Sequence, residues 1–179
     1  MISFKAHYIN SISINRISTN TPVTTSFVEL NPKCVGDISC VQDISSSWEL
    51  GGTFAKDIED HFLDCNWIGF NNGKRFFALT MQRSNFENLE PYEVLGIAQI
   101  TDDNTNQIEV NYLQTDPTNK YLAPNREFSN IGKIILDSIR KVFNKNIILK
   151  STESAKKFYK KYGFERIKRS SNFILRSKS

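Results

Sequence analysis

The hydrophobic and polar positions change their period several times along the chain, and each change marks the start of a new element. Residues 23–30 form a short apolar run that stops at residues 31–32, which predicts a strand. Residues 36–64 repeat apolar positions at helical spacing with a break at residues 51–52, which predicts two helices. Thr53 is the expected N-cap of the second helix.

Strands dominate the next part of the chain. A turn signal at residues 71–73 is followed by three strand patterns, over residues 75–83, 94–102 and 108–116. The polar turn at residues 102–104 predicts that the last two of these strands pair as an antiparallel hairpin. Residues 1–22 alternate only weakly, so we expect them to be either a lead-in strand or an irregular segment.

From residue 130 onward, helical and strand patterns alternate. Residues 130–143 form an amphipathic helix, because their apolar residues recur at intervals of four, four and three, at Ile131, Ile135, Ile139 and Val142. A buried-type strand, a helix that ends at Gly163 and two closing strands follow, over residues 146–150, 154–162, 164–168 and 172–176.

This order of elements predicts an α/β fold with one mixed, mostly antiparallel sheet of six to seven strands and about four flanking helices. The helix over residues 130–143 is expected to cross between two adjacent parallel strands, since parallel neighbours need such a connection. Residues 1–179 are expected to form a single domain, with residues 1–22 as the lead-in and residues 23–177 as the core.

The composition narrows the class of protein. Of the 179 residues, 39% are apolar and 23% are charged, which is too hydrophobic for a disordered chain. No run approaches the roughly 18 consecutive apolar residues of a membrane span, and the N-terminus lacks the pattern of a secretory leader. We therefore expect a soluble, cytoplasmic protein that does not associate with membranes.

The three cysteines and two histidines do not form a metal-binding pattern. Cys34, Cys40 and Cys65 are odd in number and include no closely spaced pair, so we expect free thiols and no metal site. His61 falls at the edge of the apolar face that Phe54, Ile58 and Phe62 form on the predicted second helix.

The net charge of +4 conceals an uneven distribution. Residues 131–179 carry fourteen Lys or Arg and three acids, or +11, whereas residues 1–130 carry nine bases and sixteen acids, or −7. The C-terminal part is therefore expected either to meet an anionic partner or to present a solvated basic face. Nucleic acid is not the expected partner, because the chain has no RNA-binding motif.

Two segments carry the candidate chemistry. A strand runs into a loop and then into a helix with Gly132 in its first turn, an arrangement that presents free backbone N–H groups to a phosphate. Further on, the segment from Leu149 to Phe164 forms a capped helix with one aromatic face, which ordinary core packing would also explain.

These two segments, in this order, resemble the GNAT acetyltransferase superfamily. The later helix matches the family signature A-x-x-F-Y-x-x-x-G-F at every fixed position, namely Ala155, Phe158, Tyr159, Gly163 and Phe164. The phosphate-loop pattern Q/R-x-x-G-x-G/A corresponds to residues 127–132, after a strand that ends at Pro117. The resemblance covers residues 93–166 in motifs and most of residues 23–177 in element order.

The sequence departs from the family pattern at three positions and in one loop. Asn130 replaces the first glycine, but asparagine tolerates the left-handed backbone better than other non-glycine residues. Glu127 stands at the Q/R position, with Arg126 one place earlier, and Thr152 replaces a frequent asparagine. The loop between residues 117 and 126 is longer than is usual in the family.

The resemblance implies that acetyl-CoA binds where a bulged strand near Leu113 splays from its parallel neighbour. Backbone groups of Leu113 and Thr115 would bond the pantetheine amides, and the loop before the helix would hold the pyrophosphate. The implied contacts are Leu113, Gln114, Thr115, Arg126, Glu127, Phe128, Ser129, Asn130, Ile131, Gly132, Lys133, Thr152 and Lys156. Acetyl-CoA is the implied co-substrate, and no metal is expected.

Two residues are implied in the chemistry. Tyr159 occupies the position of the family's general acid, which would protonate the departing thiolate, although core packing is the alternative. Glu109 lies four residues before Leu113, on the same face of a regular strand, where it would act as the general base; otherwise it is an exposed strand glutamate.

The resemblance leads to one main hypothesis and two alternatives. The main hypothesis is direct acetyl transfer from acetyl-CoA to an amine, carried by a small molecule or a protein. The alternatives are a catalytically degenerate protein that binds acetyl-CoA or a partner, and a toxin-like acetyltransferase of aminoacyl-tRNA. A cationic acceptor is favoured by eight acids, namely Glu49, Asp57, Glu59, Asp60, Asp64, Glu87, Glu90 and Glu93. The resemblance also allows a homodimer.

Overall fold

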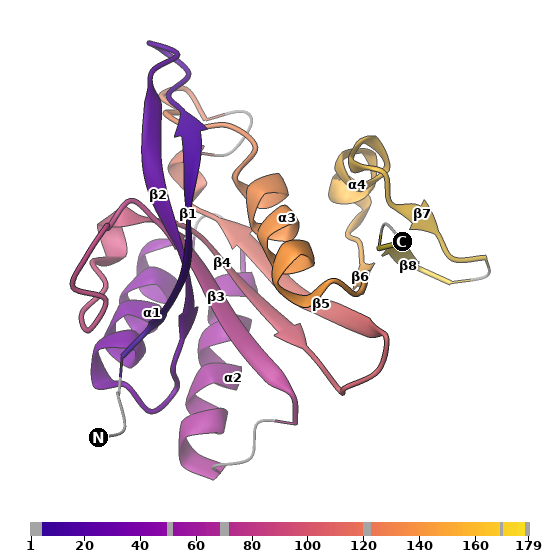
Figure 1. Ribbon diagram of the computed structural model, residues 1–179, viewed down its shortest axis with the longest axis horizontal. Helices are drawn as coiled ribbons and strands as arrows, with labels where there is room; N and C mark the ends of the chain where they lie inside the picture. The colour runs from indigo at the N-terminus through magenta and orange to yellow at the C-terminus, as the bar shows by residue number, and fades with distance from the viewer. Residues whose placement is uncertain (1–4, 50–51, 69–71, 120–122, 169, 178–179) are drawn as a thin grey trace.

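A computed structural model describes residues 5–49, 52–68, 72–119, 123–168 and 170–177. The described strands form one sheet of eight strands in the order β1-β2-β3-β4-β5-β6-β8-β7, drawn in Figure 1. They are β1 (His7–Asn15), β2 (Pro22–Leu30), β3 (Lys74–Thr80), β4 (Val94–Thr101), β5 (Gln107–Thr115), β6 (Asn146–Lys150), β7 (Glu165–Arg166) and β8 (Asn172–Leu175). The helices are α1 (Val35–Ser47), α2 (Phe54–Ile68), α3 (Ile131–Phe143) and α4 (Lys156–Tyr162).

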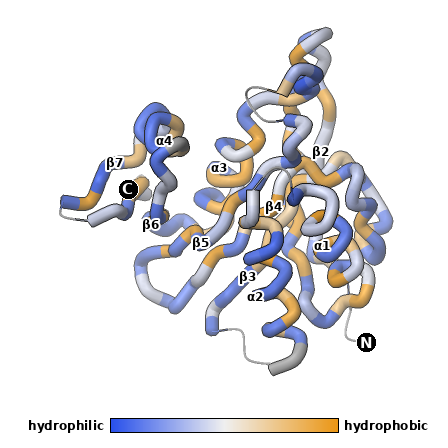
Figure 2. The backbone as a smooth tube through the Cα atoms, turned by 180° about the vertical axis from the view of Figure 1, so that it is seen from behind, coloured by the Kyte–Doolittle hydropathy of each residue, from blue (hydrophilic) through white to orange (hydrophobic). Residues whose placement is uncertain are grey.

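Helices cover both faces of the sheet. Figures 1 and 2 show α1 and α2 on one face and α3 on the other. The core under α1 and α2 is centred on Ile44, Phe62 and Phe76, whereas Phe77 and Ile135 belong to the core on the α3 side. The neighbouring residues Phe76 and Phe77 thus face opposite cores, as the alternation of a strand requires.

The predicted α/β class and the mixed, mostly antiparallel sheet are confirmed, and β5 and β6 are its parallel pair. The predicted strand count of six to seven is too low by one. Residues 7–15, which the weak alternation left undecided, form a full strand because they pair with β2 along its whole length. At the other end, β7 contributes only two residues to the sheet.

Local signals end or turn the chain where the sequence predicts. Gly163 adopts φ 100° and stops α4, and its N–H donates to the carbonyl of Lys160. Asn72 and Gly73 both have positive φ in the turn before β3. Asn71 and the first glycine of the pair at residues 51–52 lie outside the described residues.

The parallel pair β5–β6 separates after four residues, and this separation creates the site. β5 pairs with β6 only from Gln107 to Val110. The register against β4 then shifts, because Gln99 pairs with Tyr112 and Ile100 with Val110, so that Asn111 is an extra residue in a β-bulge. Residues 111–115 of β5 therefore have no strand on the side of β6.

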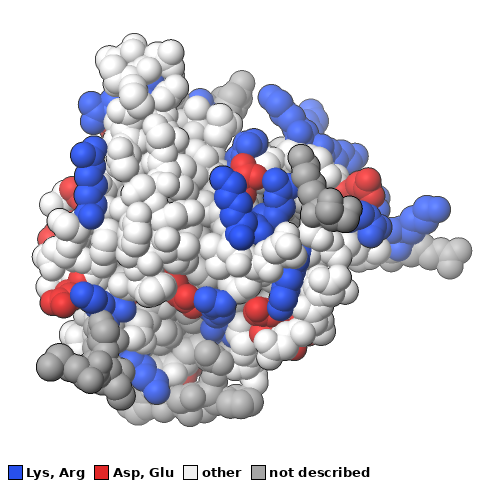
Figure 3. All heavy atoms as spheres, in the orientation of Figure 1, with Lys and Arg blue, Asp and Glu red and all other residues white. Residues whose placement is uncertain are grey.

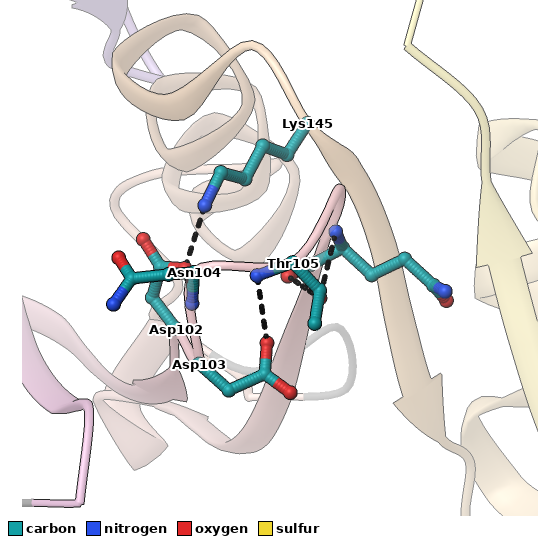
Figure 4. A network of polar contacts seen from close by, with 6 residues as sticks. Asp102, Asp103, Asn104, Thr105 and Lys145 are labelled. Atoms are coloured by element: carbon teal, nitrogen blue, oxygen red, sulfur yellow. Dashed lines mark hydrogen bonds and ion pairs between the residues drawn. The ribbon is translucent and has the colours of Figure 1, made fainter.

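A polar network holds the beginning of the parallel pair. Lys145, just before β6, lies 2.7 Å from a carboxylate oxygen of Asp102 in the turn between β4 and β5 (Figure 4). The backbone N–H of Asn104 donates to the same oxygen at 3.0 Å, and that of Thr105 donates to Asp103 at 3.1 Å. The predicted hairpin is thus confirmed, and the ion pair ties its turn to the strand that follows α3.

Candidate functional site

A cavity of about 370 Å³ occupies the gap that the splayed strand leaves. Leu113, Gln114 and Thr115 of β5 form one wall, and the first turn of α3 forms the other. Phe158 of α4 and Phe54 of α2 complete the lining. We refer to this cavity as the cleft.

Backbone N–H groups of β5 point into the cleft. The N–H of Asp116 donates to the carbonyl of Leu95 on β4 at 3.0 Å. Because amides alternate direction along a strand, the N–H groups of Leu113 and Thr115 face the opposite way, toward the open edge. This edge can accept the backbone-like amides of an extended ligand.

The loop before α3 has the backbone conformation that its sequence pattern requires. Asn130 lies in the left-handed region, with φ 61° and ψ 19°, which confirms that asparagine replaces the expected glycine without losing the turn. An added Cβ at Gly132 would lie 3.6 Å from Leu113 and 3.8 Å from Phe158. Gly132 therefore lies in a narrow space between β5 and α4.

Two of the predicted phosphate-binding amides are already occupied. The side-chain oxygen of Asn119 accepts from the N–H groups of Phe128, at 2.8 Å, and Glu127, at 3.2 Å. The Phe128 side chain is fully buried in the core. The Glu127 carboxylate pairs with Arg16 at 2.7 Å, so it is directed toward the turn between β1 and β2.

The rest of the loop faces the cleft or the cavity beside it. Arg126 and Asn130 line both the cleft and a neighbouring cavity of about 590 Å³, which Ser129 and Lys133 also line. Lys133 additionally pairs with Asp137 at 2.9 Å on its own helix. The predicted residues from 129 to 133 thus come together at the start of α3.

A contact between helices sets the position of α4. The hydroxyl of Tyr162 donates to the carboxylate of Asp137 on α3, and the ring of Tyr162 stacks on Phe158 at 6.3 Å. Burial and the neighbouring carboxylate raise the pKa of Tyr162. Lys156 pairs with Glu153 and does not line the cleft, whereas Thr152 lines a second cavity described below.

Tyr159 lies behind Phe158 and does not line the cleft. Its ring contacts Phe158 at 5.1 Å and Phe164 at 5.5 Å between centroids. Burial raises the pKa of Tyr159 to about 12, so its hydroxyl stays protonated at neutral pH. Among the described residues, none forms a hydrogen bond with this hydroxyl, which leaves its proton available.

A second cavity, of about 450 Å³, lies on the α2 side of β5. His61, Gln99 and Glu109 line it together with Lys74 and Lys150. Phe54 lines both this cavity and the cleft, so the two spaces meet at that side chain. We refer to it as the acceptor cavity, because we propose below that it holds the amine.

The expectation that Glu109 shares a strand face with Leu113 is wrong. The bulge at Asn111 inserts one residue and reverses the alternation between them. Leu113 therefore packs toward α3, whereas Glu109 lines the acceptor cavity with Tyr112. The Glu109 side chain is exposed there.

None of the eight acids that favoured a cationic acceptor lines the acceptor cavity. Glu59, which is buried, and Asp60, which is exposed, both pair with Lys56 on α2. The charged groups that do line this cavity are of both signs: the carboxylate of Glu109 and the ammonium groups of Lys74 and Lys150.

Gln114 has a structural role that its motif position does not indicate. Its side-chain oxygen accepts from the N–H of Ala55, in the first turn of α2, at 2.8 Å. Its side-chain nitrogen donates to the carbonyl of Trp48 at 3.3 Å. Gln114 thus joins β5 to the end of α1 and the start of α2. It is among the lining residues of the cleft because it lies between Leu113 and Thr115 in the strand.

Sequence analysis missed Phe54, Phe158 and Gln99 as lining residues, because packing between distant elements selects them. It placed His61 correctly at the edge of an apolar helix face.

Within the described ranges, no group of three or more His, Cys, Asp or Glu is arranged to hold a metal ion. No helix in those ranges is long and apolar enough to cross a membrane. The three cysteines are buried and unpaired.

No protein-family model and no curated protein matches the sequence. Solved structures do match in fold. A GNAT-family protein from Desulfovibrio desulfuricans has a TM-score of 0.58 at 12% identity, over 86% of this chain and 99% of that one. A GNAT-family acetyltransferase from Staphylococcus aureus Mu50 has a TM-score of 0.53 at 18% identity, and the match covers 86% of this chain and 99% of that one.

A third match is the PaiA N-acetyltransferase from Thermoplasma acidophilum, solved in complex with coenzyme A. It has a TM-score of 0.52 at 15% identity, over 87% of this chain and 99% of that one. Likeness at these identities concerns the arrangement of the backbone alone. The chain therefore has the fold of the GNAT acetyltransferases.

Proposed function

We propose that the protein transfers an acetyl group from acetyl-CoA to an amine. The observation that carries this proposal is the cleft itself. The bulge at Asn111 opens β5 from β6, and the amides of Leu113 and Thr115 face the gap beside the first turn of α3. This combination provides an open strand edge and a helix N-terminus for one extended, phosphate-bearing ligand.

The residues present fit acetyl-CoA. Leu113 and Thr115 would bond the pantetheine arm as an added strand would, and the N–H groups of Ile131, Gly132 and Lys133 would hold the pyrophosphate. Arg126 lines the same cleft and would add positive charge. The N–H of Leu113 would also stabilise negative charge that develops on the thioester oxygen.

The acceptor cavity favours an amine that also carries an acidic group. Glu109 would attract the ammonium, and Lys74 and Lys150 would attract a carboxylate or phosphate on the same molecule. Tyr159 is the proposed donor of a proton to the departing sulfur, since its hydroxyl is buried, protonated and without a described partner.

Two departures from the family pattern, at Asn130 and Glu127, are the reason to consider a catalytically degenerate protein, and neither disrupts the cleft. Asn130 takes the left-handed conformation that a glycine would supply, and Glu127 is held by Arg16 outside the cleft. The two departures from the family pattern therefore leave the cleft open and do not place a carboxylate among its lining residues.

One observation favours a second candidate acceptor, an amine attached to RNA. Figure 3 shows Lys and Arg side chains gathered over the part of the molecule that contains α3, α4 and β7. On α4, which Figure 2 colours mainly as hydrophilic, Lys157, Lys160 and Lys161 are exposed and pair with no described acid. A salt-dependent affinity for aminoacyl-tRNA would support this candidate over a free amine.

The test is a time course of CoA release from acetyl-CoA with a panel of amines, with each product identified by mass spectrometry. The panel pairs each zwitterionic amine with its amide or ester, so that the effect of the acidic group is measured directly. We expect higher kcat/KM for the zwitterionic member. Absence of acetylated product for every amine and for aminoacyl-tRNA would reject the proposed function.

A further inference from the structure

The fold sets the tautomer of the histidine in the acceptor cavity. Nδ1 of His61 lies 2.8 Å from Oε1 of Gln99. Gln99 comes from the middle of β4 and is only 1% exposed, so its amide is held inside the sheet. A carboxamide oxygen only accepts hydrogen bonds, so this contact requires the hydrogen on Nδ1, and in the neutral ring that leaves the lone pair on Nε2.

His61 contacts Tyr112, the residue of β5 that precedes Leu113 in the cleft. Its ring is 5.5 Å from that of Tyr112, which pairs with Gln99 across the two strands. Tyr112 directly precedes Leu113, whose amide faces the cleft. Phe54, seven residues before His61 on the same side of α2, lines both spaces.

Glu109 is farther from this point along β5. It precedes Tyr112 by three residues across the bulge, and the partner residues Thr101 and Gln99 on β4 are two apart, which corresponds to about 7 Å of strand. Its side chain is exposed, whereas His61 is half-buried. Both side chains line the acceptor cavity, and the imidazole of His61 is the one in ring contact with Tyr112.

We propose that His61 is the general base of the transfer and that Gln99 is the residue that positions it. This inference rests on the proposed function. The amine enters protonated, and Nε2 of His61 takes one proton from it. The nitrogen lone pair then attacks the thioester carbonyl carbon, so that the C–N bond forms and the C–S bond breaks. Tyr159 gives its proton to the CoA sulfur and regains one from the nitrogen, and the imidazolium releases its proton to water.

The first test replaces each of the two histidines. His61→Ala and His61→Gln should lower kcat by about 10²-fold or more, because the lost group acts in the transfer step. The KM for acetyl-CoA should stay within about twofold, since His61 does not line the cleft. Added imidazole should restore kcat to His61→Ala but not to His61→Gln, which leaves no empty space. His7→Ala is the matched control, because His7 is exposed on β1 and lines neither space.

The second test addresses Gln99. Gln99→Leu removes the acceptor at similar volume and should lower kcat by about tenfold. The double variant with His61→Ala should be no slower than His61→Ala alone, since both changes affect one step. Nitrogen NMR should show the Nδ1–H tautomer of His61 in the wild type and a mixture of tautomers in Gln99→Leu. A shift of melting temperature with acetyl-CoA equal to that of the wild type shows that each variant is folded.

The outcomes separate this inference from the proposed function. Wild-type turnover together with full kcat in folded His61→Ala overturns the role of His61 and leaves acetyl transfer intact. An Nε2–H tautomer in the wild type overturns the role of Gln99 and the geometry on which the base depends. If the wild type acetylates no amine and no aminoacyl-tRNA, the proposed function fails, and the inference fails with it.

Discussion

Arg16 and Glu127 form an ion pair at 2.7 Å between the turn of the β1–β2 hairpin and the loop before α3. The backbone supports the same contact, because the N–H of Ile17 donates to the carbonyl of Glu127 at 2.8 Å. A carboxylate at this loop position would oppose the binding of a pyrophosphate. The pair with Arg16 both neutralises it and directs it away from the cleft.

Removal of Arg16 should therefore weaken acetyl-CoA binding although Arg16 does not line the cleft. We expect Arg16→Ala to raise the Kd about three- to tenfold at low salt, and 1 M salt to abolish most of the difference. The double variant Arg16→Ala/Glu127→Gln should bind within about twofold of the wild type. Equal Kd values for Arg16→Ala and the double variant would show that the Glu127 charge does not reach the ligand. Isothermal titration calorimetry of the wild type and the two variants, at low and high salt, measures the Kd values.

Gly132 tests the position of the pyrophosphate. Acetyl-CoA at about 100 times its Kd should stabilise the wild type by about 2.7 kcal/mol. Gly132→Ala should keep this effect, because its Cβ fits at ordinary contact distances of 3.6 Å and more. Gly132→Glu should lose it, since the side chain adds bulk and negative charge in the cleft. A melting curve of Gly132→Glu that still shifts like that of the alanine variant would place the phosphates elsewhere.

Tyr159→Phe separates proton donation from packing. The ring contacts with Phe158 and Phe164 remain, and only the hydroxyl is lost. As a proton donor, Tyr159 requires kcat to fall by about 10²-fold while acetyl-CoA binding is retained. Tyr92→Phe is the control, because Tyr92 is 76% exposed. Full kcat in Tyr159→Phe would return this residue to a packing role.

Glu109→Gln distinguishes charge attraction from proton transfer. With His61 as the base, we expect the KM of the amine to rise about tenfold and kcat to stay within about twofold. The sequence-based prediction of Glu109 as the base requires instead that kcat/KM fall by about 10²–10⁴-fold with a matching fall in kcat. Steady-state kinetics with a saturable amine decides between the two.

Asp37 should make stability depend on pH. Its side chain is fully buried, and only one oxygen has a described partner, the N–H of Asn31 at 2.7 Å. Burial raises the pKa of Asp37 from 3.8 to about 6, so the folded state holds the proton more tightly than the unfolded state. The stabilisation by this proton is complete below about pH 4 and is lost as the pH rises through about 6.

Asp37→Asn should remove this dependence, because an amide stays neutral. Relative to the wild type, the variant should gain up to about 3 kcal/mol of unfolding free energy between about pH 4 and pH 7. Urea unfolding at several pH values measures the difference. A difference that is constant over this range would show that Asp37 titrates normally in the folded protein.

Features that depend on neighbours in the chain followed from the sequence. The α3 helix begins at Ile131 and ends at Phe143, as its apolar spacing predicts, and Gly163 ends α4 with positive φ. Asn130 supplies the left-handed residue of the loop for the same local reason. These features need only the steric limits of one residue or the period of one helix, and both can be read from consecutive positions.

The site itself depended on contacts between distant residues. The bulge at Asn111 reflects the pairing of β5 with β4, and it moved Glu109 to the face opposite Leu113. Arg16 reached Glu127, and Gln99 reached His61, because the sheet and α2 brought together residues far apart in the chain. The sequence by itself determined most of the elements, their order and the left-handed turn before α3. The tertiary structure alone decided which side chains share a cavity, because strand register and helix packing are set by surfaces that meet only in the folded molecule.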